Sequence, residues 1–122
     1  MNPFKLLNAL RGSAPRFTPQ ECAARIRSGD AVLIDLREPN ERHHGVVHQA
    51  VLLPFSDLTG ARVQWKPFLA AVAGRELLLY CGAGVRSAIA ARLLAVEGFR
   101  TANAGSFKEW ASADWPLGSR AK

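Results

Sequence analysis

The most informative stretch of the chain is residues 76–87, which read Glu-Leu-Leu-Leu-Tyr-Cys-Gly-Ala-Gly-Val-Arg-Ser. The apolar residues at 77–79 follow one another without polar alternation, which is typical of a strand covered on both faces, as in a parallel sheet flanked by helices. Residues 87–97 are rich in alanine and almost entirely apolar, and Gly98 follows them. The stretch therefore predicts a buried strand, a loop with two glycines, and a helix that packs closely on the sheet.

Helix and strand signals alternate through the rest of the chain. Thr18, Pro19 and Glu21 form a capping box with proline at the first helical position, so a helix should run to Ser28. Strands are expected at 31–36, 50–53 and 99–102. Further helices are expected at 61–72, where Pro67 interrupts the helix or marks a fresh start, and at 106–112.

This alternation predicts an α/β fold, a three-layer domain with a mainly parallel sheet flanked by helices. We expect the domain to occupy residues 17–118, with an N-terminal extension over 1–16 and a C-terminal tail over 119–122.

Composition narrows the class of protein. The 122 residues are 48% hydrophobic and 21% charged, which is ordinary for one globular domain and not typical of disordered or collagen-like chains. No apolar run approaches the ~20 residues of a transmembrane helix, and two cysteines cannot form a disulfide scaffold. The net charge of +6 suits an anionic ligand or an acidic partner. The cations form no basic run, so we expect no nucleic acid, and a monomer is the simplest state.

The first sixteen residues are basic and contain no acidic residue. Asn8 interrupts their apolar positions and Arg11 follows, a pattern that does not fit a secretory signal. A transit peptide and a helix that docks on a surface stay open as alternatives. We interpret the segment as a plain extension that ends in the breaker at residues 12–15, on a cytoplasmic protein with reduced thiols.

Cys81 is the candidate nucleophile because it lies at the carboxyl end of the predicted strand, where parallel sheets bind ligands. Gly82 and Gly84 allow backbone N–H groups to turn inward and form an anion-binding nest, and the following helix adds its positive end. Arg86 adds a fixed charge at the rim. The positive electrostatic potential of these groups should favour the thiolate form of Cys81. The alternative is a small buried cysteine that ends a strand and does no chemistry.

The chain resembles a single-domain rhodanese, a sulfurtransferase. The resemblance rests on the spacing of four residues between Cys81 and Arg86, followed by the small Ser87. Residues 33–41 (Leu-Ile-Asp-Leu-Arg-Glu-Pro-Asn-Glu) resemble the family's first signature, followed by Gly45 and by residues 50–54. Residues 104–106 with Trp110, then 115–116, resemble its C-terminal signature. The related phosphatases and arsenate reductases have one residue more between cysteine and arginine, so the loop length favours sulfur transfer.

The resemblance implies a catalytic Cys81 that carries sulfur as a persulfide, from a small anionic donor such as thiosulfate to a thiol or protein acceptor. The loop that would bind the donor comprises Gly82, Ala83, Gly84, Val85, Arg86 and Ser87. The resemblance also implies that Asp35 braces the wall of the site and that Arg37 lies near the pocket. No cofactor or metal is implied. A persulfide carrier for a partner protein and a non-catalytic binding or regulatory module remain as alternatives.

Other reactive side chains receive simpler interpretations. His43, His44 and His48 are expected to be loop histidines, because no cysteine or carboxylate cluster completes a metal site around them. Cys22 lies in an apolar helix stripe and is interpreted as core packing, with a resolving thiol for Cys81 as the alternative. The three tryptophans are expected to pack in the core or at its rim, and Trp110 could wall the pocket.

Overall fold

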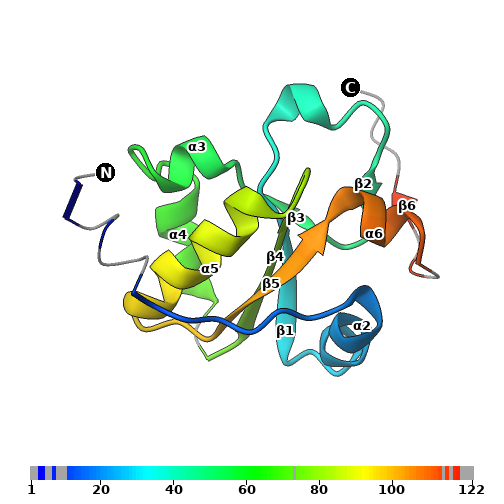
Figure 1. Ribbon diagram of the computed structural model, residues 1–122, viewed down its shortest axis with the longest axis horizontal. Helices are drawn as coiled ribbons and strands as arrows, with labels where there is room; N and C mark the ends of the chain where they lie inside the picture. Colours follow the sequence, from blue (N-terminus) through cyan, green and yellow to red (C-terminus); the bar gives the residue numbers. More distant parts are fainter. Residues whose placement is uncertain are drawn as a thin grey trace.

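A parallel sheet of four strands forms the centre of the molecule (Figure 1). The computed structural model describes residues 3–4, 7, 11–72, 74–113, 115 and 117–118. The strand order is β3 (Val51–Leu52), β1 (Ala31–Asp35), β4 (Glu76–Cys81) and β5 (Thr101–Ser106). β1 pairs with β4 along its whole length, from Ala31 opposite Glu76 to Asp35 opposite Tyr80. The predicted α/β fold with a mainly parallel sheet is confirmed.

Helices cover both faces of this sheet (Figure 1). One core lies under α3 (Phe55–Leu58), α4 (Trp65–Ala71) and α5 (Val85–Val96). The other lies under α2 (Pro19–Arg27) and α6 (Phe107–Ala111). The side chains of β4 alternate between them, with Leu77, Leu79 and Cys81 in the first core and Leu78 and Tyr80 in the second. This alternation explains why β4 has no polar position in its interior.

Small side chains bring α5 close to the sheet. Ala90 and Ala91 are fully buried, and the Thr101 hydroxyl donates to the Ala91 carbonyl at 2.7 Å. A larger residue at either alanine would push the helix away from β4 and β5. The close packing fixes where the first turn of α5 lies relative to the end of β4.

The outer edge of β5 is paired with the segment that precedes α2. The Phe17 amide donates to the Asn103 carbonyl at 3.0 Å, and the Asn103 amide donates to the Pro15 carbonyl at 2.9 Å. Residues 15–17 therefore continue the sheet by one short parallel bridge, centred on Arg16 and Asn103. This pairing holds the backbone of Asn103 from its open side.

Several element boundaries differ from those predicted. The helix expected from Ser87 begins two residues earlier, at Val85, because Gly84 occupies the N-cap position. The strand expected at 99–102 is β5, which begins at Thr101 and runs to Ser106. Pro67 lies in the first turn of α4, where proline needs no amide hydrogen, so it marks a fresh start and not an interruption.

Besides the 3-10 helix η1 (Pro39–Glu41), three short elements of the described chain were not predicted. α3 begins directly after Pro54. A separate two-stranded antiparallel sheet pairs β2 (Val46–Val47) with β6 (Leu117–Gly118). Two-residue strands leave no periodic pattern in the sequence, and their pairing joins segments that are distant along the chain. Within the part of the chain that the structure describes, no helix has the length and apolar character needed to cross a membrane.

The capping box at the start of α2 is present as predicted, and it offers a test of the local energetics. The Glu21 amide donates to the Thr18 hydroxyl at 3.2 Å, and the Thr18 amide donates to the Glu21 carboxylate at 2.8 Å. Thr18→Ala removes one of the two bonds and should lower the free energy of unfolding by about 1 kcal/mol. Thr18→Ser keeps the hydroxyl and should stay within about 0.5 kcal/mol of wild type in urea unfolding. Equal losses of unfolding free energy in both variants would show that the Thr18 hydroxyl does not stabilise the helix.

Candidate active site

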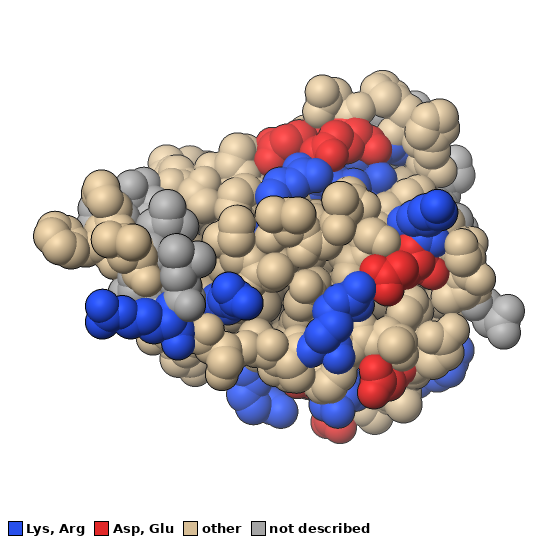
Figure 2. Space-filling model, viewed as in Figure 1, with Lys and Arg blue, Asp and Glu red and all other residues tan. Residues whose placement is uncertain are grey.

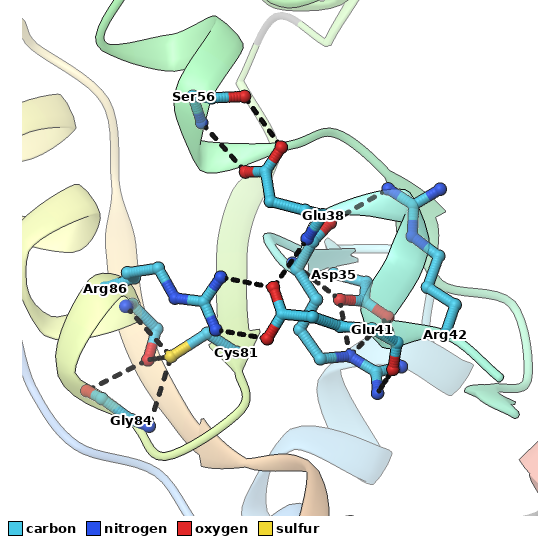
Figure 3. A network of polar contacts seen from close by, with 10 residues as sticks. Asp35, Glu38, Glu41, Arg42, Ser56, Cys81, Gly84 and Arg86 are labelled. Atoms are coloured by element: carbon cyan, nitrogen blue, oxygen red, sulfur yellow. Dashed lines mark hydrogen bonds and ion pairs between the residues drawn. The ribbon is translucent and has the colours of Figure 1, made fainter. Parts of the chain in front are cut away.

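The sulfur of Cys81 lies at the carboxyl end of β4 and accepts hydrogen bonds from the start of α5 (Figure 3). The Gly84 amide donates to Sγ at 3.1 Å and the Ser87 amide at 3.4 Å. The Ser87 hydroxyl oxygen lies 3.4 Å from the same sulfur. Three polar groups therefore surround the thiol at the positive end of a 12-residue helix. Such an arrangement stabilises negative charge on sulfur.

The loop between β4 and α5 reaches this arrangement through its glycines. Gly84 has φ +92°, a left-handed conformation that side chains rarely adopt, and it caps α5. A Cβ at Gly82 would lie 3.1 Å from the Arg86 guanidinium, so the bare backbone admits that side chain. Gly82, Ala83 and Gly84 form the loop itself, while Val85, Arg86 and Ser87 form the first turn of α5.

Cys81 itself has no exposed surface. No bulky residue occurs within the loop itself. The side chains of Ala83 and Val85 are indeed exposed, but the sulfur lies beneath the backbone and beside the ion pair of Arg86. A reagent can reach the sulfur only when this cover shifts.

Arg86 does not present a free charge at the rim, because Glu41 binds it through both carboxylate oxygens at 2.6 and 2.8 Å. The Arg86 hydrogen bonds lower the pKa of Glu41 from 4.5 to about 2. The same pairing raises the pKa of Arg86, so its guanidinium remains charged. Glu41 therefore belongs to the candidate site, although in the sequence it stands only within the motif at residues 33–41. No local spacing could identify its partner 45 residues away.

Asp35 and Arg37 form a buried ion pair behind the loop. Arg37 Nη2 lies 2.8 Å from the Asp35 carboxylate, and the two side chains are 4% and 0% exposed. The Tyr80 hydroxyl also donates to Asp35, at 2.7 Å. Arg37 further donates to the carbonyls of Glu41 and Gly45 at 3.0 and 2.9 Å. Asp35 therefore binds Arg37 and Tyr80, and the charge of Arg37 is directed at protein groups.

A short 3-10 helix, η1 (Pro39–Glu41), brings carboxylates to the rim of the site. The Glu38 amide donates to the Glu41 carboxylate at 2.9 Å, and the Glu38 carboxylate accepts from the amide and hydroxyl of Ser56 (Figure 3). Figure 2 shows carboxylates at the η1 edge of the molecule with cations directly against them, and further charges of both signs over the rest of this face. The positive charge at the η1 edge is therefore offset by carboxylates.

The other residues singled out from the sequence lie away from Cys81. Cys22 is buried in the second core, on the face of the sheet opposite Cys81, and burial raises its pKa to about 12. This separation argues against a resolving thiol. Trp110 is also in the second core, where its indole donates to the Ala104 carbonyl at 2.8 Å, so it does not wall the pocket. His43, His44 and His48 are exposed. Among the described residues, no group of three metal-ligating side chains occurs.

Comparison with known proteins shows which family the chain belongs to. A model of the rhodanese-like domain matches residues 18–113. The chain belongs to the rhodanese-like domain family. A tRNA uridine(34) hydroxylase from Xanthomonas axonopodis is 33% identical over 98 residues, and the match covers 73% of this chain. It covers only 38% of that relative's length.

Two solved structures share the fold along most of their length. A human single-domain sulfurtransferase is 25% identical with a TM-score of 0.66, over 84% of this chain and 99% of the other. A Rhodopseudomonas palustris protein described as a possible tyrosine phosphatase is 25% identical with a TM-score of 0.72, over 93% and 90% of the two chains. The rhodanese-like family assignment thus agrees with the resemblance seen in the sequence.

Loss of the counter-charge of Arg37 should be strongly destabilising. Asp35→Asn leaves a buried guanidinium without its carboxylate and should lower the free energy of unfolding by about 3–5 kcal/mol. Asp30→Asn changes an exposed carboxylate one residue before β1 and should stay within about 0.5 kcal/mol of wild type. Urea unfolding of both variants tests the difference. Similar losses in the two would show that the buried pair contributes no special stability.

The Glu41–Arg86 pair should make stability depend on pH. Because the folded pKa of Glu41 is lowered to about 2, its stabilisation is present above the ordinary value of 4.5 and is lost as pH falls through 2. After allowance for partial exposure, Glu41→Gln should lower the free energy of unfolding by about 1 kcal/mol at neutral pH. The difference from wild type should shrink below about pH 4. A difference that is constant with pH would contradict this assignment.

Proposed function

We propose that the protein is a sulfurtransferase that moves sulfane sulfur from thiosulfate or a similar anionic donor to a thiophilic acceptor through a persulfide on Cys81. The observation that supports this most directly is the set of N–H groups that converge on Sγ at the start of α5. They stabilise a thiolate before attack. The human sulfurtransferase and the family assignment support the same class of reaction.

The reaction has two balanced displacements. The Cys81 thiolate attacks the outer sulfur of thiosulfate, the S–S bond of the donor breaks, and sulfite leaves with the bonding pair. The acceptor, a thiolate or cyanide, then attacks the terminal sulfur of the persulfide. The bond between that sulfur and Sγ breaks, and Cys81 returns as a thiolate. No net oxidation occurs and no cofactor is required.

The first turn of α5 supplies the remaining electrostatic stabilisation. The amides of Val85 and Arg86 lie at helix positions that have no partner within the helix, so they suit the oxygens of a sulfur oxyanion. Arg86 adds positive potential, reduced by its pairing with Glu41. Because Cys81 has no exposed surface, donor attack requires a small opening of the loop above it. Its glycines provide the freedom for that movement.

Two alternatives predict different products. A persulfide carrier would use the same Cys81 chemistry but deliver sulfur rapidly only to a docked partner protein. A phosphatase, suggested by the description of the Rhodopseudomonas protein, is disfavoured by the four-residue spacing between Cys81 and Arg86. We propose no RNA substrate on the basis of the tRNA hydroxylase, because the cations form no basic run along the chain. A cytoplasmic location fits a free thiol nucleophile.

Intact mass spectrometry after incubation with thiosulfate tests the proposal. The protein should gain one sulfur atom, and cyanide should remove it. Cys81→Ser should gain none, whereas Cys22→Ala is the matched control and should gain sulfur like the wild type, since Cys22 lies on the opposite face of the sheet. Wild-type protein that stays unmodified, or Cys81→Ser that is labelled equally well, would contradict the assignment.

A further inference from the structure

The hydroxyl of Ser87 lies at the centre of a buried polar cluster beneath the loop. Ser87 is fully buried, and its Oγ lies 3.4 Å from Cys81 Sγ and 2.8 Å from Asn103 Oδ1. The carbonyls of Gly84 and Gly105 are the next acceptors, at 3.2 and 3.5 Å. A hydroxyl carries a single hydrogen, so Ser87 can donate to only one of these groups at a time. The nearest acceptor is the Asn103 amide.

The orientation of the Asn103 amide is determined by its surroundings. The Gly105 amide donates to Oδ1 at 2.9 Å, which requires oxygen and not nitrogen at that position. The Nδ2 group lies on the side of the Gly84 carbonyl, at 3.5 Å. The backbone of Asn103 is held by Pro15 and Phe17 in the sheet pairing described above. Oδ1 is therefore a fixed acceptor that faces Ser87.

We infer that Asn103 is a positioning residue that competes with the Cys81 sulfur for the hydroxyl hydrogen of Ser87, and so sets the balance between thiol and thiolate. In the thiol form, Cys81 donates to Ser87 Oγ, and Ser87 donates to Asn103 Oδ1. When the loop above Cys81 opens and the thiol releases its proton to solvent, the Ser87 hydrogen turns from Oδ1 to the sulfur anion. Oδ1 keeps the Gly105 amide, so only one hydrogen bond is exchanged.

This exchange of one hydrogen bond is compatible with both steps of the proposed sulfur transfer. Its role in catalysis rests on that proposed function. Before donor attack, Ser87 is a third donor to the thiolate. Once Sγ is bonded to a second sulfur it carries no charge and accepts weakly, so the Ser87 hydrogen can return to Asn103. Asn103 thus favours the neutral forms of Sγ. Because Asn103 competes for the Ser87 hydrogen, the thiolate is more basic, and therefore more nucleophilic, than it would be if Ser87 donated to it alone.

The charged groups near the cluster are bound to one another and not to the two residues that exchange the hydrogen bond. Arg86 on α5 is bound by Glu41, Glu109 on α6 is bound by Arg16, and Asp35 after β1 is bound by Arg37. None of these pairs includes Ser87 or Asn103. Among the residues that the structure describes, these two side chains form hydrogen bonds with each other, with Cys81 and with backbone groups of Gly84 and Gly105.

The test is the pH dependence of the rate at which iodoacetamide alkylates Cys81, measured in a Cys22→Ala background. Asn103→Leu keeps the number and branching of the side-chain heavy atoms but has no acceptor, so Ser87 donates more readily to the thiolate. The midpoint of the profile should fall by about 0.5 pH units, which corresponds to part of one hydrogen bond. The limiting rate above the midpoint should fall by less than about 2-fold, because nucleophilicity falls with basicity. Asn103→Asp places a stronger acceptor beside Ser87 and should raise the midpoint.

A second set of variants shows whether the effect passes through the hydroxyl. In a Ser87→Ala background, Asn103→Leu should leave the midpoint unchanged, while thermal unfolding reports on the integrity of each fold. A midpoint that does not move in Asn103→Leu, or that moves equally without Ser87, would overturn the inference. Alkylation needs no sulfur donor, so the two proposals fail separately. Failure to acquire sulfur from thiosulfate would contradict the proposed function but would not affect the alkylation test of Asn103.

Discussion

The buried ion pair between Asp35 and Arg37 connects the parts of the molecule that form the site. Asp35 ends β1 beside Tyr80 of β4, so the pair is anchored in the centre of the sheet. From there Arg37 binds the carbonyl of Glu41, whose carboxylate binds Arg86 in the first turn of α5. The chain of contacts thus runs from the sheet through η1 to the cysteine loop. Two charges taken out of water are stable only because each finds several partners.

The sheet register decides which face receives the reactive sulfur. Side chains alternate along β4, so Cys81 points to the core beneath α5 while Tyr80 points to the other face and reaches Asp35. One strand therefore supplies the proposed nucleophile on one side and the anchor of the ion pair on the other. A shift of one residue in the pairing of β1 and β4 would exchange these positions and separate Cys81 from the start of α5.

Local signals predicted much of this architecture. The capping box at Thr18, the apolar run of β4 and the glycines before α5 each act over a few residues, and their elements were placed within one or two positions. β5 was misplaced because its residues, Thr-Ala-Asn-Ala-Gly-Ser, have low strand propensity and become a strand through packing between β4, α5 and α6. Likewise, the cysteine loop was predicted, whereas Glu41 and Asn103 act through partners 45 and 16 residues away.

The two cysteines lie on opposite faces of the central sheet, and this has a consequence for oxidative damage. A cysteine thiolate is the form that peroxides oxidise to sulfenic acid, and a neighbouring thiol normally traps that product as a disulfide. Cys22 is held in the other core and cannot reach Cys81 without disrupting the sheet. Recovery of an oxidised Cys81 therefore depends on thiols from outside the chain. Without them the sulfur would proceed to the irreversible sulfinic and sulfonic acids.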